Sequence, residues 1–504
     1  MHLLPAIFTL ALALASFPAV HSPAADPQRV GDVEISQWRG FNLLEKFTLR
    51  GNAPFVEDDF RWIAELGFNF VRLPMDYRCY TDADDWLKFQ EPVLQEIDQA
   101  IAYGEKHGIH VCVNLHRAPG FCINPPEEPS NLWTDDEPLA AFIAHWVMFA
   151  RRWKSIPSTR LSFNLLNEPT RSSREDYLKV FQRTIEAIQK EDPQRLIIVD
   201  GINVGREPVP EFLAYRNVIQ ATRGYHPGTI SHYKASWVKG SDQWPEPTWP
   251  PQFQIGGYLY GAAKPELRSP LVLQGELPAG TEITLRLNQA SQKVHLVAQA
   301  DGRAVAEGTY DPQADPQNWR RVESEQRWPI YQASGEVRWS AVLPTAAQQF
   351  SLENAAGDWL KFSELTVQLP GGRRFAYGTD QTWGRQQTPL RMSLDGGLVP
   401  PPGVDPEAPL TDYLQPWREI SAQGAAVFVG EWGCFNQTPH PVTLAWMTSW
   451  LEKWKQARFG WALWNFRGSF GILDSNRKDV VYEDWHGHKL DRQMLTLLQK
   501  YLKP

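Results

Sequence analysis

Short apolar segments alternate along the chain with longer stretches in which apolar and polar residues repeat at helical spacing. Eight apolar segments predict strands, at residues 38–43, 68–74, 109–116, 161–168, 195–201, 217–225, 425–433 and 459–466. Helical spacing recurs between them, for example at residues 91–108, 175–192 and 444–458. Most of the apolar segments do not alternate with polar residues, which is typical of parallel strands covered on both faces. Eight strands with interleaved helices predict an α/β fold, the (β/α)8 or TIM barrel.

The alternation stops between about residues 261 and 400. Four strand-like segments separated by turn residues take its place, at 281–287, 293–302, 335–343 and 359–369. This pattern is typical of a β-sandwich. It falls between the sixth and seventh predicted barrel strands, and a surface loop tolerates such an insertion because its ends already lie close together. We therefore expect an inserted all-β, jelly-roll-like sandwich at 262–400 and a barrel in two segments, 26–261 and 401–504.

Residues 1–25 follow neither pattern. They are apolar from Leu3 to Ala15, and small residues and prolines follow before the first charged residue, Asp26. The apolar run is too short to span a bilayer and is typical of a signal peptide, although no positive charge precedes it. An uncleaved anchor is the alternative interpretation. We expect a secreted or periplasmic protein that has no contact with the membrane after removal of the signal, and a monomer.

Composition and charge narrow the classes of partner. The 504 residues are 42% hydrophobic and 21% charged, as in a globular protein, and carry a net charge of −8. No long basic run is present, which argues against nucleic acid as a partner. The 22 tryptophans and 15 tyrosines can stack on flat, uncharged ligands such as sugars, although most such residues are ordinarily part of the core.

The four cysteines form no CxxC pair, so the spacing of a metal site is absent. Cys112 lies in a predicted strand, where a buried thiol is expected. Cys79 and Cys122 each follow a predicted strand, and a disulfide between them is compatible with an exported protein.

Two glutamates end predicted barrel strands. Glu168 lies in FNLLNEPT at 163–170, where the following proline stops the fourth strand, and Glu431 lies in FVGEWG at the end of the seventh. The carboxyl ends of barrel strands meet at one face. Two carboxylates that converge there are what cleavage of a glycosidic bond requires, since one protonates the leaving oxygen and the other attacks the anomeric carbon or activates a water. A structural ion pair with an arginine is the alternative for either glutamate alone.

The motifs NEP, GEWG and WNFRGSFG, which follow the fourth, seventh and eighth strands, together resemble glycoside hydrolase family 5, the cellulase-type barrels of clan A. The resemblance covers roughly 30–260 and 400–504. It implies that Glu168 is the acid/base, that Glu431 is the nucleophile and that Trp464 forms the floor of the −1 sugar site. It also implies retaining double displacement with no metal and no organic cofactor.

The resemblance extends to residues around the two glutamates. It places Arg72 where an arginine binds the nucleophile, His116 at the histidine of strand three, Asn167 at the asparagine that binds the sugar 2-hydroxyl, and Tyr225 at the tyrosine that positions the nucleophile. Arg223 departs from the pattern, because similar family members carry a histidine there. Arginine is always cationic, whereas histidine can be neutral. We therefore expect Arg223 to depress the pKa of the acid and to alter the pH optimum or the activity.

The expected function is retaining hydrolysis of β-glycosidic bonds in a polysaccharide or oligosaccharide, with endo-β-1,4-glucanase (cellulase) activity as the family's commonest case. A β-mannanase, a xyloglucanase and an exo-acting β-glucosidase or β-glucanase would use the same residues. A carbohydrate-binding protein, in which Arg223 has weakened catalysis and the inserted sandwich binds glycan, is the alternative outside the enzyme class.

Overall fold

The computed structural model describes residues 27–250, 255–323, 329–393, 397–399 and 405–503. The predicted signal peptide, residues 1–25, lies outside these ranges. The chain forms two compact units, one made of the residues up to Glu246 together with those from Leu410, and the other of Pro247–Pro409. No helix in the described ranges is both long enough and apolar enough to span a bilayer.

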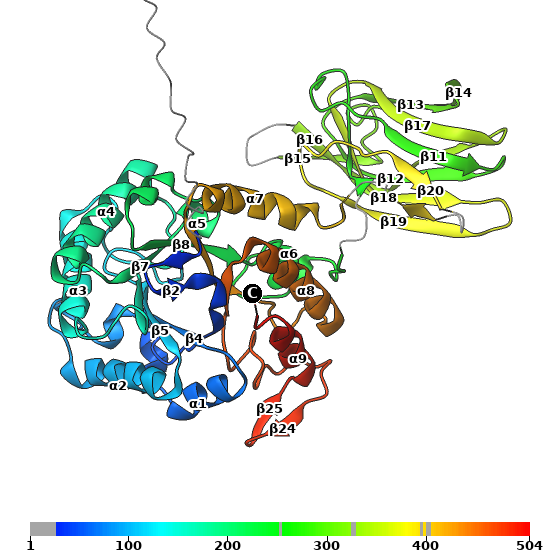
Figure 1. Ribbon diagram of the computed structural model, residues 1–504. Coiled ribbons are helices and arrows are strands. Elements are labelled where there is room, and N and C mark those ends of the chain that lie inside the picture. Colours follow the sequence, from blue (N-terminus) through cyan, green and yellow to red (C-terminus); the bar gives the residue numbers. More distant parts are fainter. Residues whose placement is uncertain (1–26, 251–254, 324–328, 394–396, 400–404, 504) are drawn as a thin grey trace, which may run out of the picture. The chain divides into compact units, whose positions relative to one another are not determined.

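The first unit is a closed barrel of eight parallel strands with helices around it (Figure 1). In order around the barrel, the strands are β3 (Arg39–Asn42), β4 (Phe70–Asp76), β5 (His110–Arg117), β6 (Leu161–Asn164), β7 (Leu196–Asp200), β8 (Val218–Gly224), β22 (Ala426–Trp432) and β23 (Gly460–Leu463). Every residue in these strands is buried, which explains why the segments are mostly apolar instead of alternating. The predicted TIM barrel is confirmed.

The helices that surround the barrel are α1 (Glu57–Glu65), α2 (Glu91–His107), α3 (Asp136–Arg152), α4 (Arg174–Glu191), the short α5 (Ile202–Gly205) and α6 (Gly228–Ser231), α7 (Ala408–Ala422), α8 (His440–Ala457) and α9 (Arg492–Lys500). Local signals set their ends. The hydroxyl of Ser173 accepts a hydrogen bond from the backbone N–H of Asp176 and caps the start of α4. Gly108 ends α2 with a φ of 69°, a left-handed conformation that glycine adopts without steric cost.

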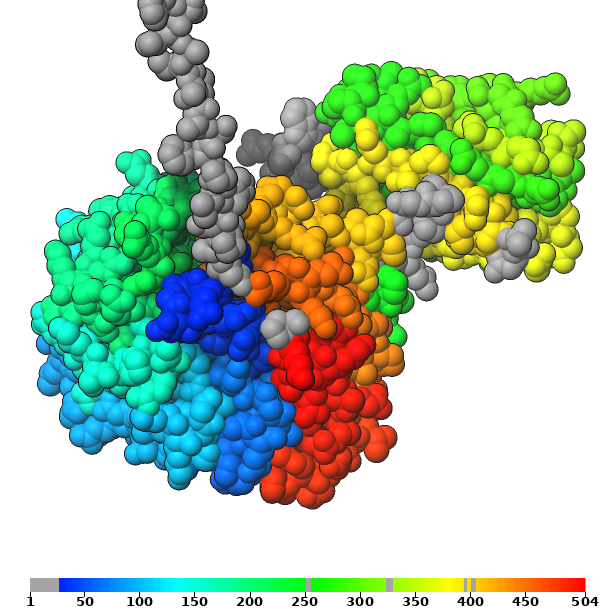
Figure 2. All heavy atoms as spheres, viewed as in Figure 1, coloured from blue at the N-terminus to red at the C-terminus, as the bar shows by residue number. Residues whose placement is uncertain are grey.

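The start of the barrel lies beside the end of the chain. Figure 2 shows the first described residues, in dark blue, against the C-terminal segment in red. The buried guanidinium of Arg39, the first residue of β3, donates through Nε to the carbonyl of Tyr501, which follows α9, at 2.8 Å. The C-terminal segment is therefore tied to the first barrel strand.

A tryptophan cluster packs behind the seventh barrel strand. Its members are Trp432 at the end of β22, Trp446, Trp450 and Trp454 on α8, and Trp461 on β23. The ring centroids of Trp432 and Trp454 are 4.8 Å apart, and those of Trp432 and Trp461 are 5.4 Å apart. A Cβ at Gly224, the last residue of β8, would lie only 2.6 Å from the Cβ of Trp432, so glycine is required there. This packing fixes the strand end that carries Glu431.

The second unit consists of two mainly antiparallel sheets. One contains β9 (Ile255–Gly256), β10 (Tyr258–Tyr260), β12 (Glu282–Ala290), β15 (Trp319–Glu323), β16 (Pro329–Val342), β18 (Trp359–Gln368) and β19 (Arg374–Asp380). The other contains β11 (Leu271–Leu277), β13 (Val294–Ala300), β14 (Arg303–Tyr310), β17 (Ala347–Ala356), β20 (Leu390–Met392) and β21 (Leu398–Val399). Leu285, Leu296, Phe350 and Phe362 are fully buried in the core of this unit. In the sequence the unit lies between β8 and β22, so an all-β insertion between barrel strands six and seven is confirmed.

The four cysteines are buried free thiols, so the disulfide between Cys79 and Cys122, which the sequence leaves open, is not formed. Each of these two thiols is directed at a different backbone carbonyl. The Cys79 thiol donates to the carbonyl of Lys46 at 3.5 Å, and the Cys122 thiol donates to that of His116 at 3.8 Å.

Glu45, in the loop after β3, is a partly buried residue with a buried carboxyl oxygen, and its charge should reduce the stability of the folded protein. Burial raises its pKa to about 7, and its Oε2 accepts no hydrogen bond from any described residue. Because the folded protein holds this proton more tightly than the unfolded chain, stability should fall as the pH rises from about 4.5 through 7. Glu45→Gln removes that charge, so its Tm should exceed that of the unmodified protein at pH 8 by a few degrees, since about 1 kcal/mol corresponds to roughly 2–4 °C.

Thermal unfolding followed by circular dichroism at pH 4.5 and pH 8 measures this difference. Glu186→Gln, at an exposed position on α4, is the matched control and should change the Tm at neither pH. An equal Tm change for Glu45→Gln at both pH values would contradict the assignment.

Candidate active site

A cavity of about 1050 Å³ opens where the barrel strands end, and all of its lining residues belong to the first unit. Its aromatic lining consists of Phe47, Tyr225, Trp237, Trp244, Tyr413, Trp464 and Phe470. Trp237 is 56% exposed, so an aromatic surface faces the solvent at this position. Trp464 follows β23, and its ring centroid lies 5.5 Å from that of His116. The cavity therefore combines broad ring faces with the polar groups described below.

Glu431 lies on β22 and is held by two donors. Arg72, on β4, donates through Nη1 to its Oε1 at 2.5 Å, and the Tyr225 hydroxyl donates to its Oε2 at 3.3 Å. Arg72 is itself fixed, because its guanidinium also donates to Asn42, Asn164 and Asn167 at 2.8 to 3.0 Å. All of these side chains come from barrel strands or their ends, so the position of the Glu431 carboxylate is set by the barrel.

Glu168 lies at the mouth of the same cavity, but not at the end of its strand. β6 ends at Asn164, four residues earlier than the predicted segment, and Glu168 has a left-handed φ of 48°. Burial and the negative charge of Glu431 raise the pKa of Glu168 to about 7. A carboxyl of this kind holds its proton near neutral pH, as a general acid must.

His116, at the end of β5, is neutral. Burial, together with the charge of Arg72, holds its pKa well below the ordinary value. Its Nε2 accepts a hydrogen bond from the amide of Asn167 at 3.1 Å, so the ring proton is assigned to Nδ1. Nδ1 has no hydrogen-bond partner among the described residues and lies 3.9 Å from Oε1 of Glu431. The ring thus offers a free donor beside Glu431.

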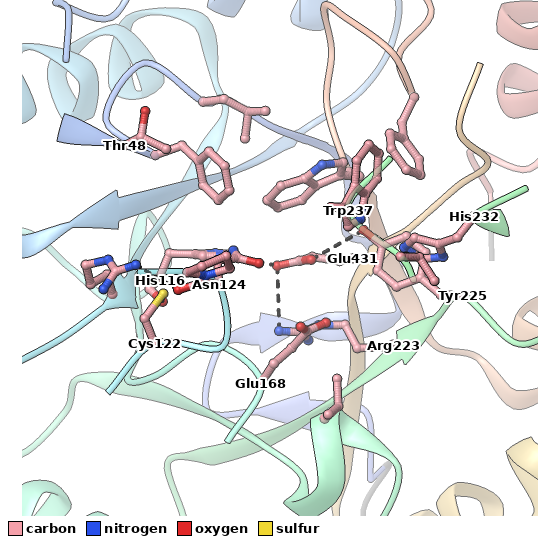
Figure 3. A pocket seen from close by; sticks show the side chains of 18 of the residues that line it. Thr48, His116, Cys122, Asn124, Glu168, Arg223, Tyr225, His232, Trp237 and Glu431 are labelled. Carbon is pink, nitrogen blue, oxygen red and sulfur yellow. Dashed lines mark hydrogen bonds and ion pairs between the residues drawn. The ribbon is translucent and has the colours of Figure 1, made fainter. Parts of the chain in front are cut away.

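Arg223, on β8, lies between the two carboxylates (Figure 3). Its Nε donates to Oε1 of Glu168 at 3.2 Å, and its Nη2 lies 3.7 Å from Oε1 of Glu431. The same Nη2 donates to Asn167 at 2.8 Å and forms an ion pair with Asp200. The expected effect of Arg223 on the acid is confirmed in direction, because Arg223 lowers the pKa of Glu168. Burial and the charge of Glu431 outweigh it, so the pKa of Glu168 is raised.

The structure brings all eight predicted site residues together. Six line the cavity: His116, Glu168, Arg223, Tyr225, Glu431 and Trp464. Arg72 and Asn167 lie beside them and bond to the lining residues. Sequence reasoning missed Asp200, the last residue of β7. The signal was present, because Asp200 directly follows the apolar run LIIV, just as Glu168 follows the apolar residues of the fourth predicted strand.

Comparisons with known proteins agree with this geometry. The sequence model of the family described as Cellulase (glycosyl hydrolase family 5) matches residues 29–243. Endoglucanase C of Acetivibrio thermocellus is 27% identical over 210 residues, which are 41% of this chain and 59% of that protein. The probable glucan 1,3-beta-glucosidase A of Emericella nidulans is 28% identical over 183 residues, which are 34% of this chain and 44% of that protein. The chain thus spans about half the length of these two relatives.

A solved structure described as that of a glycoside hydrolase superposes with a TM-score of 0.58 at 26% identity, and the match covers 92% of this chain and 99% of that chain. Residues 29–243, which carry the first six barrel strands and Glu168, are therefore similar to the cellulase family, glycosyl hydrolase family 5.

Proposed function

We propose that the protein is a retaining glycoside hydrolase that cleaves internal β-1,4 bonds in a glucan chain. One observation carries this proposal: a carboxyl that holds its proton near neutral pH, Glu168, and an arginine-bound carboxylate, Glu431, share one cavity at the mouth of a barrel. Two relatives with names that specify glucan as the substrate support the substrate class. The predicted export also agrees with action on a polymer outside the cell.

In the first step, an oxygen of Glu431 attacks the anomeric carbon while the bond from that carbon to the leaving-group oxygen breaks. Glu168 gives its proton to this oxygen, and a glycosyl ester with Glu431 remains. Formation of the ester removes the negative charge of Glu431, which is one of the causes that raise the pKa of Glu168. Glu168 therefore becomes the base that takes a proton from water, and the hydroxide attacks the anomeric carbon and releases Glu431.

The remaining residues of the site have roles in the same scheme. Arg72 and Tyr225 aim the Glu431 carboxylate, and the free Nδ1–H of His116 is available to a sugar hydroxyl. Trp464 offers a ring face for stacking on the sugar, and Trp237 provides a second aromatic surface in the cavity wall. This combination of ring faces and neutral donors suits an uncharged sugar chain.

Hydrolysis of a substrate panel by the purified protein tests the proposal. We expect turnover of carboxymethylcellulose with an early fall in viscosity, slower turnover of glucomannan and xyloglucan, and new sugar ends that proton NMR first detects as the β-anomer. An α-anomer as the first product would contradict retention. Release of glucose alone from laminarin would favour exo-acting β-1,3-glucanase activity instead. Binding of oligosaccharide without turnover would favour the carbohydrate-binding protein.

A further inference from the structure

Asp200 is a completely buried carboxylate, and both of its oxygens are occupied. Oδ1 accepts a hydrogen bond from the amide of Asn164 at 3.0 Å, and Oδ2 accepts one from the backbone N–H of Glu168 at 2.9 Å. Oδ2 also pairs with Nη2 of Arg223. Asp200 has no exposed side-chain surface and does not line the cavity, so it acts only through its neighbours.

Two of these contacts converge on one residue, Glu168. Its backbone has a positive φ, which a non-glycine residue adopts at a cost unless its surroundings hold it. The hydrogen bond from the Glu168 N–H to Asp200 stabilises this backbone conformation. Arg223, which Asp200 fixes in turn, donates to the Glu168 carboxylate. Asp200 thus contacts Glu168 directly at the backbone and through Arg223 at the side chain.

The pair also controls the charge beside the acid. An arginine with no counter-ion in this position would favour the ionised form of Glu168, which could no longer donate a proton. The ionised Asp200 offsets that charge, so Arg223 orients the carboxyl while the pair adds no net charge. The other charged groups that face Glu168 are Glu431 and Arg72, and the phenols of Tyr225 and Tyr413 also lie within electrostatic range.

We propose that Asp200 and Arg223 form a positioning pair that holds Glu168 in its working orientation and leaves no net charge of its own beside the Glu168 carboxyl. This inference rests on the proposed function, in which Glu168 is the acid. In this pair, Asp200 on the neighbouring strand β7 is the counter-ion of Arg223, the residue that departs from the histidine of the family pattern.

Two single substitutions should shift the titration of Glu168 in opposite directions. Asp200→Asn leaves the charge of Arg223 without its counter-ion, so the pKa of Glu168 should fall by about 1 pH unit or more. Arg223→Gln leaves the charge of Asp200 without its counter-ion, so the pKa should rise. The double variant carries neither charge, and its value should return toward that of the unmodified protein. A structural role alone would not produce shifts of opposite sign.

The titration is measured without substrate, by carbon-13 NMR of the protein labelled at its glutamate carboxyls, with the Glu168 signal assigned from its absence in Glu168→Gln. The pH dependence of kcat/KM on a nitrophenyl cellobioside is measured in parallel, and its basic limb should move with the NMR value. Asp192→Asn is the matched control, because Asp192 forms an ion pair with the buried Arg195 at 2.7 Å, outside the cavity. It should move neither quantity.

Unchanged Glu168 titration in Asp200→Asn and Arg223→Gln would overturn the positioning pair, even in an active enzyme. Opposite NMR shifts in a protein that hydrolyses no glycoside would support the pair and contradict the proposed function. If Asp200→Asn does not fold, the titration of Glu168 in Arg223→Gln tests the proposal by itself, because the proposal requires the pKa of Glu168 to rise in that variant.

Discussion

Glu431→Ala should lose at least about 10⁴-fold in kcat on carboxymethylcellulose and on nitrophenyl cellobioside, the scale on which removal of a covalent nucleophile acts. Without this carboxylate no glycosyl ester can form. Arg72 and Tyr225 also lose the group that they orient. Reducing-sugar and nitrophenol release measure the effect, and circular dichroism shows whether the variant is folded.

A small anion can take the place of the missing carboxylate. Sodium azide should restore part of the rate on nitrophenyl cellobioside, because azide attacks the anomeric carbon as the bond to nitrophenol breaks, and the product should be the α-glycosyl azide. Glu96→Gln is a suitable control, since Glu96 forms an ion pair with the buried Lys46 at 2.6 Å and lies outside the cavity. It should keep kcat within about tenfold. Glu431→Ala with an unreduced rate would exclude Glu431 as the nucleophile.

Glu168→Gln should lose about 10²–10⁴-fold in kcat on polysaccharide, the usual contribution of a general acid. On a dinitrophenyl cellobioside, whose leaving group departs without protonation, the first step should change little. The loss should therefore depend on the leaving group, which a general loss of structure would not produce. Steady-state rates on the two substrates, with the burst of dinitrophenol recorded by stopped flow, measure the contrast.

The pH profile gives a second test of the same residue. Because burial and Glu431 raise the pKa of Glu168 to about 7, the acid is protonated below that pH and loses its proton above it. In the unmodified protein kcat/KM should therefore fall as the pH rises through about 7. With nitrophenyl cellobioside as the substrate for both proteins, this basic limb should disappear in Glu168→Gln. A limb that persists would mean that a group other than Glu168 controls it.

The parts of the fold that could be predicted from the sequence are those that depend on burial along a continuous segment. Barrel strands covered on both faces must be apolar throughout, and the sandwich strands expose one face, so the two units differ visibly in the sequence. Glu168 and Glu431 could be found because a carboxylate that follows an apolar strand is costly unless it has a use.

The parts that could not be predicted depend on distances across the barrel. The ion pair of Asp200 with Arg223 joins two neighbouring strands, and neither residue signals the other in the sequence. The direction in which Arg223 shifts the pKa of Glu168 could be predicted from the sequence, but the burial and the negative charges of Glu431 and Asp200 that oppose it could not. The end of β6 was also misplaced by four residues, because the left-handed turn at Glu168 depends on a hydrogen bond from β7.

The place of the sandwich in the chain also constrains how the protein is made. β22 and β23 close the barrel between β8 and β3, yet they leave the ribosome only after the whole sandwich has been synthesised. Until then the six completed strands have two unpaired edges, which are prone to join other chains. The sandwich has its own core and can fold during this interval. Glu168 is therefore synthesised well before Glu431, and the complete cavity can form only after the last two barrel strands have been synthesised.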